Sequence, residues 1–176
     1  PYQVYTYYMR KWKKRLPGLP SRAWKPPREI PTLSGIPGIE IPDGLDRLSS
    51  LPFKPGEEEA QNKLRVFLEG GRPPIYQYKR TRDRPDLEGT SALSPYFHLG
   101  MISTREAVRG AMQAVRNAPD SSAEESARTW LNELIWREFY ITILFHFPDV
   151  LNNNFQSAYD HIPWRNDPRE FEAWKE

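Results

Sequence analysis

The sequence has no cysteine among its 176 residues, which excludes disulfides and thiolate metal sites. Its three histidines are scattered and show no metal-ligand spacing. No apolar run approaches the length of a membrane-spanning helix. The start at Pro1 lacks the charged and then apolar leader of a signal peptide. These absences favour a cytoplasmic protein of a reducing compartment, with no membrane association, cut from a longer chain.

Proline and basic residues dominate the N-terminal third. Prolines recur from residue 16 to residue 55 too often for a long regular element, which predicts an extended connector there. Basic side chains crowd the first thirty residues against a single acid, Glu29: they are Arg10, Lys11, Lys13, Lys14, Arg15, Arg22, Lys25 and Arg28. This charge is compatible with a polyanion partner or with a solvated surface that binds nothing.

Helical spacing of apolar residues begins at Gly56 and predicts an all-α domain over residues 56–176. The first helix carries Ala60, Leu64, Phe67 and Leu68 on one face and ends at Gly70. Residues 72–93 are polar and proline-rich, so we expect a surface loop there. No period-two strand pattern persists after residue 56.

Cap and breaker residues predict four further helices. Ser94 and Pro95 open a short one that ends at Gly100. A capping box of Ser103 and Glu106 opens the next, whose apolar face is Ala107, Ala111, Met112 and Val115. A second box, Ser122 and Glu125, begins the longest helix, which runs to about Phe147. Asp167 and Pro168 open the last.

One face of the longest predicted helix combines aromatic and charged side chains. Trp130, Glu133, Arg137 and Tyr140 fall at i, i+3, i+7 and i+10, with Trp136 beside them. Such a face can stack on a planar heterocycle and hydrogen-bond to it. The alternative is a buried pair of Glu133 and Arg137 among core tryptophans. The other side, with Leu131, Leu134, Ile135 and Ile141, is expected to pack in the core.

A hydroxyl-rich segment precedes the short helix at Pro95. Thr90, Ser91 and Ser94 lie where free backbone amides and the positive end of a helix dipole favour an anion, above all a phosphate. Plain helix capping is the alternative. Asp83, between Arg82 and Arg84, is expected to form salt bridges rather than to act as a general acid, since no nucleophile or second carboxylate accompanies it.

Three ordered motifs closely resemble the photolyase/cryptochrome family. They are YxxxRDxP over residues 78–85, EGTSALSPYFHLGMIS over 88–103 and WLNELIWREFY over 130–140. The resemblance extends over the whole chain. It implies that residues 1–15 end a nucleotide-type α/β antenna domain, that residues 16–55 form the interdomain linker, and that residues 56–176 are the first part of the multi-helical FAD- and DNA-binding domain.

The resemblance also implies roles for individual residues. FAD would contact Tyr78, Thr90, Ser91, Ala92, Leu93, Ser94 and Trp130. Glu133 and Trp136 would meet a flipped-out pyrimidine dimer, the first by hydrogen bonding and the second by stacking. Arg82, Arg137 and Tyr140 would lie along the DNA. The third motif is most similar to bacterial class I photolyases for cyclobutane pyrimidine dimers.

The implied activity is light-driven repair by a monomeric flavoprotein, with a second antenna chromophore of folate or deazaflavin type in the domain that precedes this chain. Excited reduced flavin would donate an electron to the dimer, the cyclobutane ring would split, and the electron would return. Two alternatives stay open: a cryptochrome-type photoreceptor that binds FAD without repair, and a helical DNA-binding or interaction module without cofactor.

Overall fold

The structure is a computed structural model that describes residues 1–16, 27–31, 35, 38 and 53–176. Every regular element in these ranges is a helix, which confirms the predicted all-α fold. The predicted connector at 16–55 lies mostly outside the described residues. The division of the chain into three parts stays a prediction.

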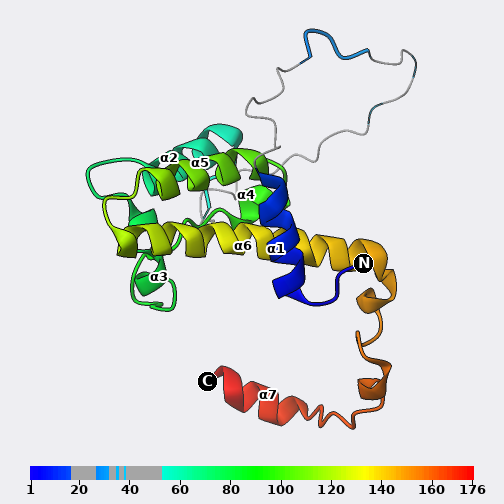
Figure 1. Cartoon of the computed structure of the whole chain (residues 1–176). Coiled ribbons are helices and arrows are strands. Elements are labelled where there is room, and N and C mark those ends of the chain that lie inside the picture. The colour runs from blue at the N-terminus through cyan, green and yellow to red at the C-terminus, as the bar shows by residue number, and fades with distance from the viewer. Residues whose placement is uncertain (17–26, 32–34, 36–37, 39–52) are drawn as a thin grey trace.

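The axis of the fold is α6, the 26-residue helix Ser121–His146 (Figure 1). It packs lengthwise against α5, Thr104–Arg116. The start of α6 is fixed by Asp120, whose carboxylate accepts a hydrogen bond from the backbone amide of Ala123 at 2.8 Å. Because Asp120 occupies the cap position, the predicted capping by Ser122 is wrong, although the helix begins and ends about where expected.

The α2 helix, Glu57–Leu68, closes the other side of α5. Its predicted face is confirmed: Ala60, Leu64 and Phe67 are buried. The two helices approach so closely that a Cβ atom added at Gly110 of α5 would collide with the Leu68 side chain. A residue without a side chain therefore suits this crossing.

Two short helices occupy part of the segment that the sequence predicted as a loop. They are η3, Pro74–Tyr76, and α3, Tyr78–Thr81. Both are anchored by the buried Ser126 of α6, whose hydroxyl donates to the Ile75 carbonyl at 2.8 Å and accepts from the Lys79 amide at 2.9 Å. The loop prediction was wrong here because a contact far apart in sequence orders a locally polar segment.

The α4 helix, Ser94–His98, confirms the predicted short helix. Its cap residue is Leu93, however, and no side chain caps it, so the predicted role of the Ser94 hydroxyl as a cap is wrong. The α5 helix begins after Ser103 as expected, but without a side-chain capping bond from that residue.

The N-terminal helix α1, Tyr5–Arg15, crosses α6 and lies in front of it in Figure 1. Tyr5, Tyr8 and Trp12 fall at i, i+3 and i+7 and pack against the core as partly buried side chains. The Tyr5 hydroxyl donates a hydrogen bond to the Asn132 carbonyl of α6 at 3.1 Å. This helix therefore belongs to the same packed unit as α5 and α6.

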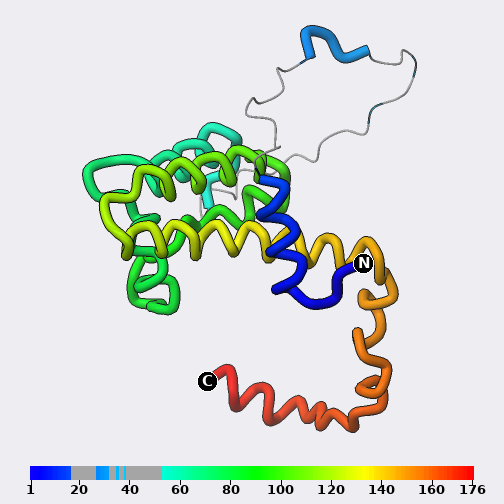
Figure 2. The backbone as a smooth tube through the Cα atoms, in the orientation of Figure 1, coloured from blue at the N-terminus to red at the C-terminus, as the bar shows by residue number. Residues whose placement is uncertain are grey.

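The chain after α6 leads away from the helical layers (Figure 2). It forms η4, Pro148–Leu151, η5, Ser157–Tyr159, and α7, Pro168–Lys175, none of which contains a buried residue. Asp167 caps α7 as predicted. Ile141, expected in the core, is 48% exposed, because the packed layers end before the last turns of α6. No helix in the described ranges has the length and hydropathy needed to cross a membrane.

Candidate functional site

Three rings form what we call the inner aromatic cluster: Phe67 of α2, Tyr78 of α3 and Trp130 of α6. The Phe67 ring lies 5.0 Å from Trp130 and 6.0 Å from Tyr78, centroid to centroid. Trp130 is only 3% exposed and Tyr78 only 8%. Burial raises the pKa of the Tyr78 phenol, which therefore stays neutral. Tyr78 and Trp130, two of the seven residues expected at FAD, thus pack on the same Phe67 ring in the core. The core position of Trp130 agrees with the alternative of core tryptophans.

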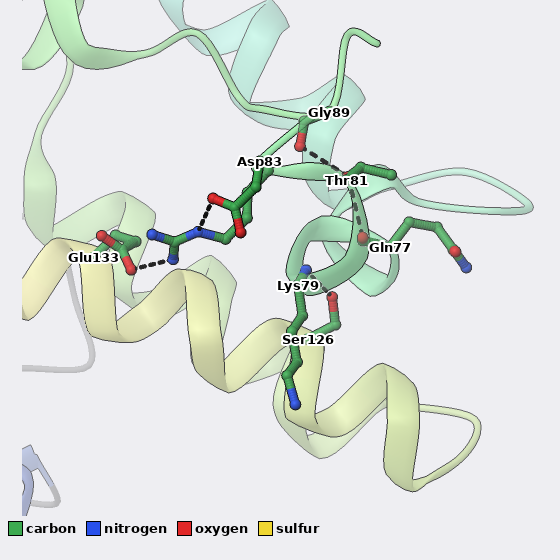
Figure 3. Close-up of polar contacts among 8 residues, drawn as sticks. Gln77, Lys79, Thr81, Asp83, Gly89, Ser126 and Glu133 are labelled. Atoms are coloured by element: carbon green, nitrogen blue, oxygen red, sulfur yellow. Dashed lines mark hydrogen bonds and ion pairs between the residues drawn. The ribbon is translucent and has the colours of Figure 1, made fainter. Parts of the chain in front are cut away.

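The Arg82 guanidinium joins α3 to α6. Its Nη1 donates to Oε1 of Glu133, and its Nε lies 3.6 Å from Oδ1 of Asp83 (Figure 3). The same guanidinium lies over the Tyr78 ring, 5.4 Å from its centroid. The hydrogen bond to Glu133 raises the pKa of Arg82 further above its usual range, so this guanidinium is charged at any physiological pH.

Arg82 and Glu133 are each about one third exposed, so a ligand can reach both. The sequence offered Arg137 as the partner of Glu133, and the structure differs. Arg137 donates instead to the Phe97 carbonyl at 3.1 Å and lies 3.5 Å from the Thr104 hydroxyl. It therefore ties α6 to α4 and α5. The pairing that sequence spacing suggested is replaced by one 51 residues apart.

The segment 90–94 is held against α3 at its start. Thr81 Oγ1 donates to the Gly89 carbonyl at 3.1 Å (Figure 3). A Cβ atom added at Gly89 would lie 2.5 Å from the Thr81 carbonyl oxygen, so glycine is required for this contact. The segment that follows therefore starts beside the helix that carries Tyr78 and Arg82.

Two successive residues of this segment have backbone dihedral angles of opposite handedness. Ala92 has φ +50°, the one non-glycine residue of the described chain with positive φ, and Leu93 follows with φ −91° and ψ −4°. Successive residues of opposite hand point their amides into a common concavity that suits an anion. Leu93 is buried as an anchor, whereas Thr90 and Ser94 are exposed and Ser91 is half-buried.

A second group of rings, which we call the outer aromatic cluster, consists of Tyr5, Trp136 and Tyr140. Tyr5 stacks on Trp136 with centroids 3.4 Å apart and planes 6° from parallel. Tyr140 is offset from Trp136, at 5.5 Å and 21°, and is 62% exposed. Sequence reasoning found Trp136 and Tyr140 but missed Tyr5. The signal that could have found it is the helical spacing of Tyr5, Tyr8 and Trp12, which form one face of α1.

A large hollow of about 1060 Å³ lies elsewhere, between α2 and α5. Its lining is charged in both signs, with Glu57 and Glu58 facing the same groove as Arg65 and Arg109. None of the residues predicted to bind FAD or DNA lines it. The predicted site residues therefore lie away from this groove: Glu133 meets Arg82 beside α3, and Trp136 and Tyr140 form the separate outer aromatic cluster.

Comparison with known proteins gives a consistent result. Residues 130–176 match the family described as the FAD binding domain of DNA photolyase. The chain is 40% identical over 175 residues to a deoxyribodipyrimidine photo-lyase of Thermus thermophilus, covering 99% of this chain and 37% of that protein. It is 34% identical over 182 residues to the photo-lyase of Halobacterium salinarum, covering 100% of this chain and 37% of that one.

A solved structure agrees with these relatives. The crystal structure of a bacterial class III photolyase from Agrobacterium tumefaciens superposes with a TM-score of 0.72 at 30% identity, over 99% of this chain and 36% of that chain. The chain spans somewhat more than a third of the length of the curated relatives that it matches. The chain is thus similar along nearly its whole length to proteins named deoxyribodipyrimidine photo-lyase, and its C-terminal part matches the FAD binding domain of DNA photolyase.

Proposed function

We propose that this chain supplies part of the flavin- and lesion-binding region of an enzyme that repairs cyclobutane pyrimidine dimers in DNA with light. One observation carries the proposal: the Arg82 guanidinium links Glu133, the residue expected at the lesion, to Tyr78, a residue expected at the cofactor. Similarity to proteins named deoxyribodipyrimidine photo-lyase along nearly the whole chain supports it.

The segment 90–94 fits the phosphates of FAD. Because Ala92 and Leu93 have backbone dihedral angles of opposite handedness, their amide donors point into a common concavity. The hydroxyls of Thr90, Ser91 and Ser94 add donors on a partly accessible surface. Tyr78 and Trp130 are too deeply buried to stack on the flavin broadly, so their part is to form the apolar wall behind it. When bound, reduced FAD in its light-excited state would supply the electron that splits the dimer.

Glu133 and Trp136 would recognise the lesion. The second carboxylate oxygen of Glu133 can accept from a base edge while its first stays paired with Arg82. Trp136, half-buried on the same helix, offers an indole on which a flipped-out base can stack. Flipping costs a few kcal/mol and costs least where the pair is already damaged, which itself favours the lesion.

The arginines would hold the DNA. Arg82 is one third exposed, and Arg137 is half-buried, with Tyr140 exposed on the next turn. Contacts from such groups to phosphates are independent of sequence and weaken as salt displaces them. Arg137 already bonds to the Phe97 carbonyl, so its contribution to DNA binding would be smaller than that of Arg82.

The subclass is a finer proposal. The string WLNELIWREFY, which holds Glu133 and Trp136 together, favours repair of the cyclobutane dimer and the bacterial class I type. The protein would act as a monomer and carry a folate- or deazaflavin-type antenna chromophore outside this chain. The resemblance of this string to the photolyase/cryptochrome family supports these features.

Repair by the full-length protein tests the proposal. Anaerobic, photoreduced protein would be illuminated with an oligonucleotide that contains a cyclobutane dimer, and repair would be followed by the recovery of thymine absorbance. We expect repair by the wild type and a clear loss in Glu133→Ala. Glu138→Ala removes an exposed carboxylate from the same helix and should repair normally.

Two outcomes would contradict the proposal. Bound flavin without repair would point to a cryptochrome-type photoreceptor. If the protein binds no flavin, the remaining hypothesis is a helical DNA-binding or interaction module without cofactor. Equal losses of repair in Glu133→Ala and Glu138→Ala would mean that Glu133 has no special role at the lesion. The proposed repair activity of the protein would still stand.

A further inference from the structure

We propose that Tyr5 is a positioning residue for lesion recognition, holding the Trp136 indole so that one of its faces is presented to a flipped-out base. This inference rests on the proposed function. It adds a residue from α1, a helix that sequence reasoning attributed to another domain, to the recognition surface on α6.

The Tyr5 ring covers one whole face of Trp136. Centroids 3.4 Å apart in planes only 6° from parallel describe full overlap, not the offset that most aromatic pairs adopt. No flat ligand can stack on the face that Tyr5 occupies. The indole therefore has a single face left for a base.

Tyr5 is itself fixed in place at two points. Its hydroxyl donates to the Asn132 carbonyl, one turn before Trp136, at 3.1 Å. Its ring edge packs on Phe139 at 5.8 Å and 73°, and Phe139 is buried. Because the hydroxyl and the ring of Tyr5 both have fixed partners, Tyr5 restricts the rotation of Trp136 about its side-chain torsions.

The remaining side of Trp136 is open by comparison. Tyr140 lies against the indole with an offset, at 5.5 Å, and is 62% exposed. An exposed side chain changes rotamer at little cost, so Tyr140 can yield to an incoming base or pack beside it. Firm support on one face and a yielding neighbour suit the stacking of a base.

Tyr5 also lies beside the other proposed lesion residue. Burial, and in second place the negative charge of Glu133, raise the pKa of the Tyr5 phenol to about 12. Tyr5 therefore stays neutral over the whole physiological range and keeps the proton that it donates to Asn132. The support for Trp136 is thus independent of pH under conditions of repair.

The helix offers its own matched control in Tyr8. Tyr8 also docks α1 on α6: its ring packs on Phe139 at 5.4 Å, and its hydroxyl lies 3.4 Å from that of Thr142. Its ring pairs are with Tyr2 and Phe139, and not with Trp136. Losing Tyr8 weakens the same helix contact without removing the support of the indole.

The test compares Tyr5→Leu with Tyr5→Phe and Tyr8→Leu in the full-length, flavin-loaded protein. The first readout is the ratio of dissociation constants for undamaged duplex and for the same duplex with one cyclobutane dimer. Tyr5→Leu should lower this ratio roughly tenfold, the size of a weakened base stack, with undamaged binding unchanged. Tyr5→Phe keeps the stack and should stay within about threefold of the wild-type ratio. Tyr8→Leu should preserve the ratio.

A second readout needs no DNA. In protein labelled with 5-fluorotryptophan, the fluorine resonance of Trp136 is assigned by its disappearance in Trp136→Phe. Tyr5→Leu should move that resonance, since the stacked ring no longer shields it, and Tyr8→Leu should not. If Tyr5→Leu fails to fold, Tyr5→Met replaces it with a side chain of similar length and no ring.

The two readouts separate the possible failures. A wild type that does not distinguish damaged from undamaged duplex contradicts the proposed function. In that case an unmoved fluorine resonance would also overturn the positioning role. An unchanged ratio in Tyr5→Leu, or an equal loss in Tyr8→Leu, overturns the positioning role alone, because it would leave Tyr5 as packing between α1 and α6.

Discussion

The two aromatic clusters built on α6 differ in how they are closed. In the inner aromatic cluster, Phe67, Tyr78 and Trp130 are all buried and come from α2, α3 and α6. In the outer aromatic cluster, Trp136 is half-buried and Tyr140 is 62% exposed. The two tryptophans are only six residues apart on one helix.

This difference separates two aromatic clusters on one helix, one enclosed in the core and one open to solvent on one side. Six residues turn the helix by about 600°, which puts the two indoles on different sides. The Trp130 ring packs on Phe67 of α2 and is almost fully buried, whereas the Trp136 ring is covered on one face by Tyr5 of α1 and stays half-buried. Rings in the first cluster stabilise the fold by burial, and rings in the second leave a planar surface partly exposed.

The largest expected effect sets the two tryptophans against each other. Trp130→Ala should lower the free energy of unfolding by about 3–5 kcal/mol, since it leaves a cavity in the core. Trp136→Ala should cost at least about 2 kcal/mol less, because the side chain is only half-buried. Urea denaturation followed by circular dichroism would measure both. Equal losses would mean that the outer aromatic cluster is core as well.

The next effect concerns the anchor of the inner aromatic cluster. Ser126→Ala should cost about 1–3 kcal/mol, because the Ile75 carbonyl and the Lys79 amide lose a buried partner. These groups hold α3, the helix that presents Tyr78. Thr129→Ala is the matched control on α6, since its exposed hydroxyl bonds only to the Glu125 carbonyl of its own helix. Its cost should stay within about 0.5 kcal/mol in the same denaturation experiment.

A smaller effect is expected where α6 begins. Asp120→Ala should cost about 1 kcal/mol, the usual worth of a helix cap. Fraying of the first turn should speed amide hydrogen exchange near the inner aromatic cluster and leave the turns that carry Trp136 unchanged. Ser122→Ala, which removes the cap that the sequence suggested, should be close to neutral. If Ser122→Ala lowered the stability more than Asp120→Ala, the capping box predicted from the sequence would be correct after all.

The helices were predictable because local signals agree along most of the chain. The apolar face of α2 and the Asp167 cap of α7 follow from spacing and chemistry within one or two turns. Caps were less predictable, since several side-chain oxygens compete near the start of α6 and it is Asp120, two residues before Ser122, that accepts from the Ala123 amide. The missed α3 shows the same limit, because Ser126 orders it from 47 residues away.

The candidate site was predictable in its members but not in its pairs. Spacing on one helix identified Glu133 and Arg137 together, yet the fold pairs Glu133 with Arg82 and Arg137 with a backbone carbonyl. Tyr5 contacts Trp136 from a helix at the other end of the chain, and the contact depends on how α1 crosses α6. Such contacts are set by the packing of helices, which no local pattern encodes.

The smallest effect tests the support of the outer aromatic cluster through pH. The raised pKa of Tyr5, about 12, means that the folded protein holds this proton more tightly than the unfolded chain, where the pKa is 10.0. The contribution of Tyr5 to stability is therefore complete below pH 10 and is lost as pH rises toward about 12.

Tyr5→Phe isolates this contribution. At about pH 9 the wild type should be more stable than Tyr5→Phe by about 1 kcal/mol, the worth of the hydrogen bond to Asn132. By about pH 11 the difference should shrink, because the unfolded wild type has released the Tyr5 proton. Tyr8, Tyr78 and Tyr96 also have raised pKa values and give both proteins a common decline, so only the difference is informative. A difference that stays constant with pH would mean that folding does not bury the Tyr5 phenol, and the contrast between a supported and an open face of Trp136 would fail.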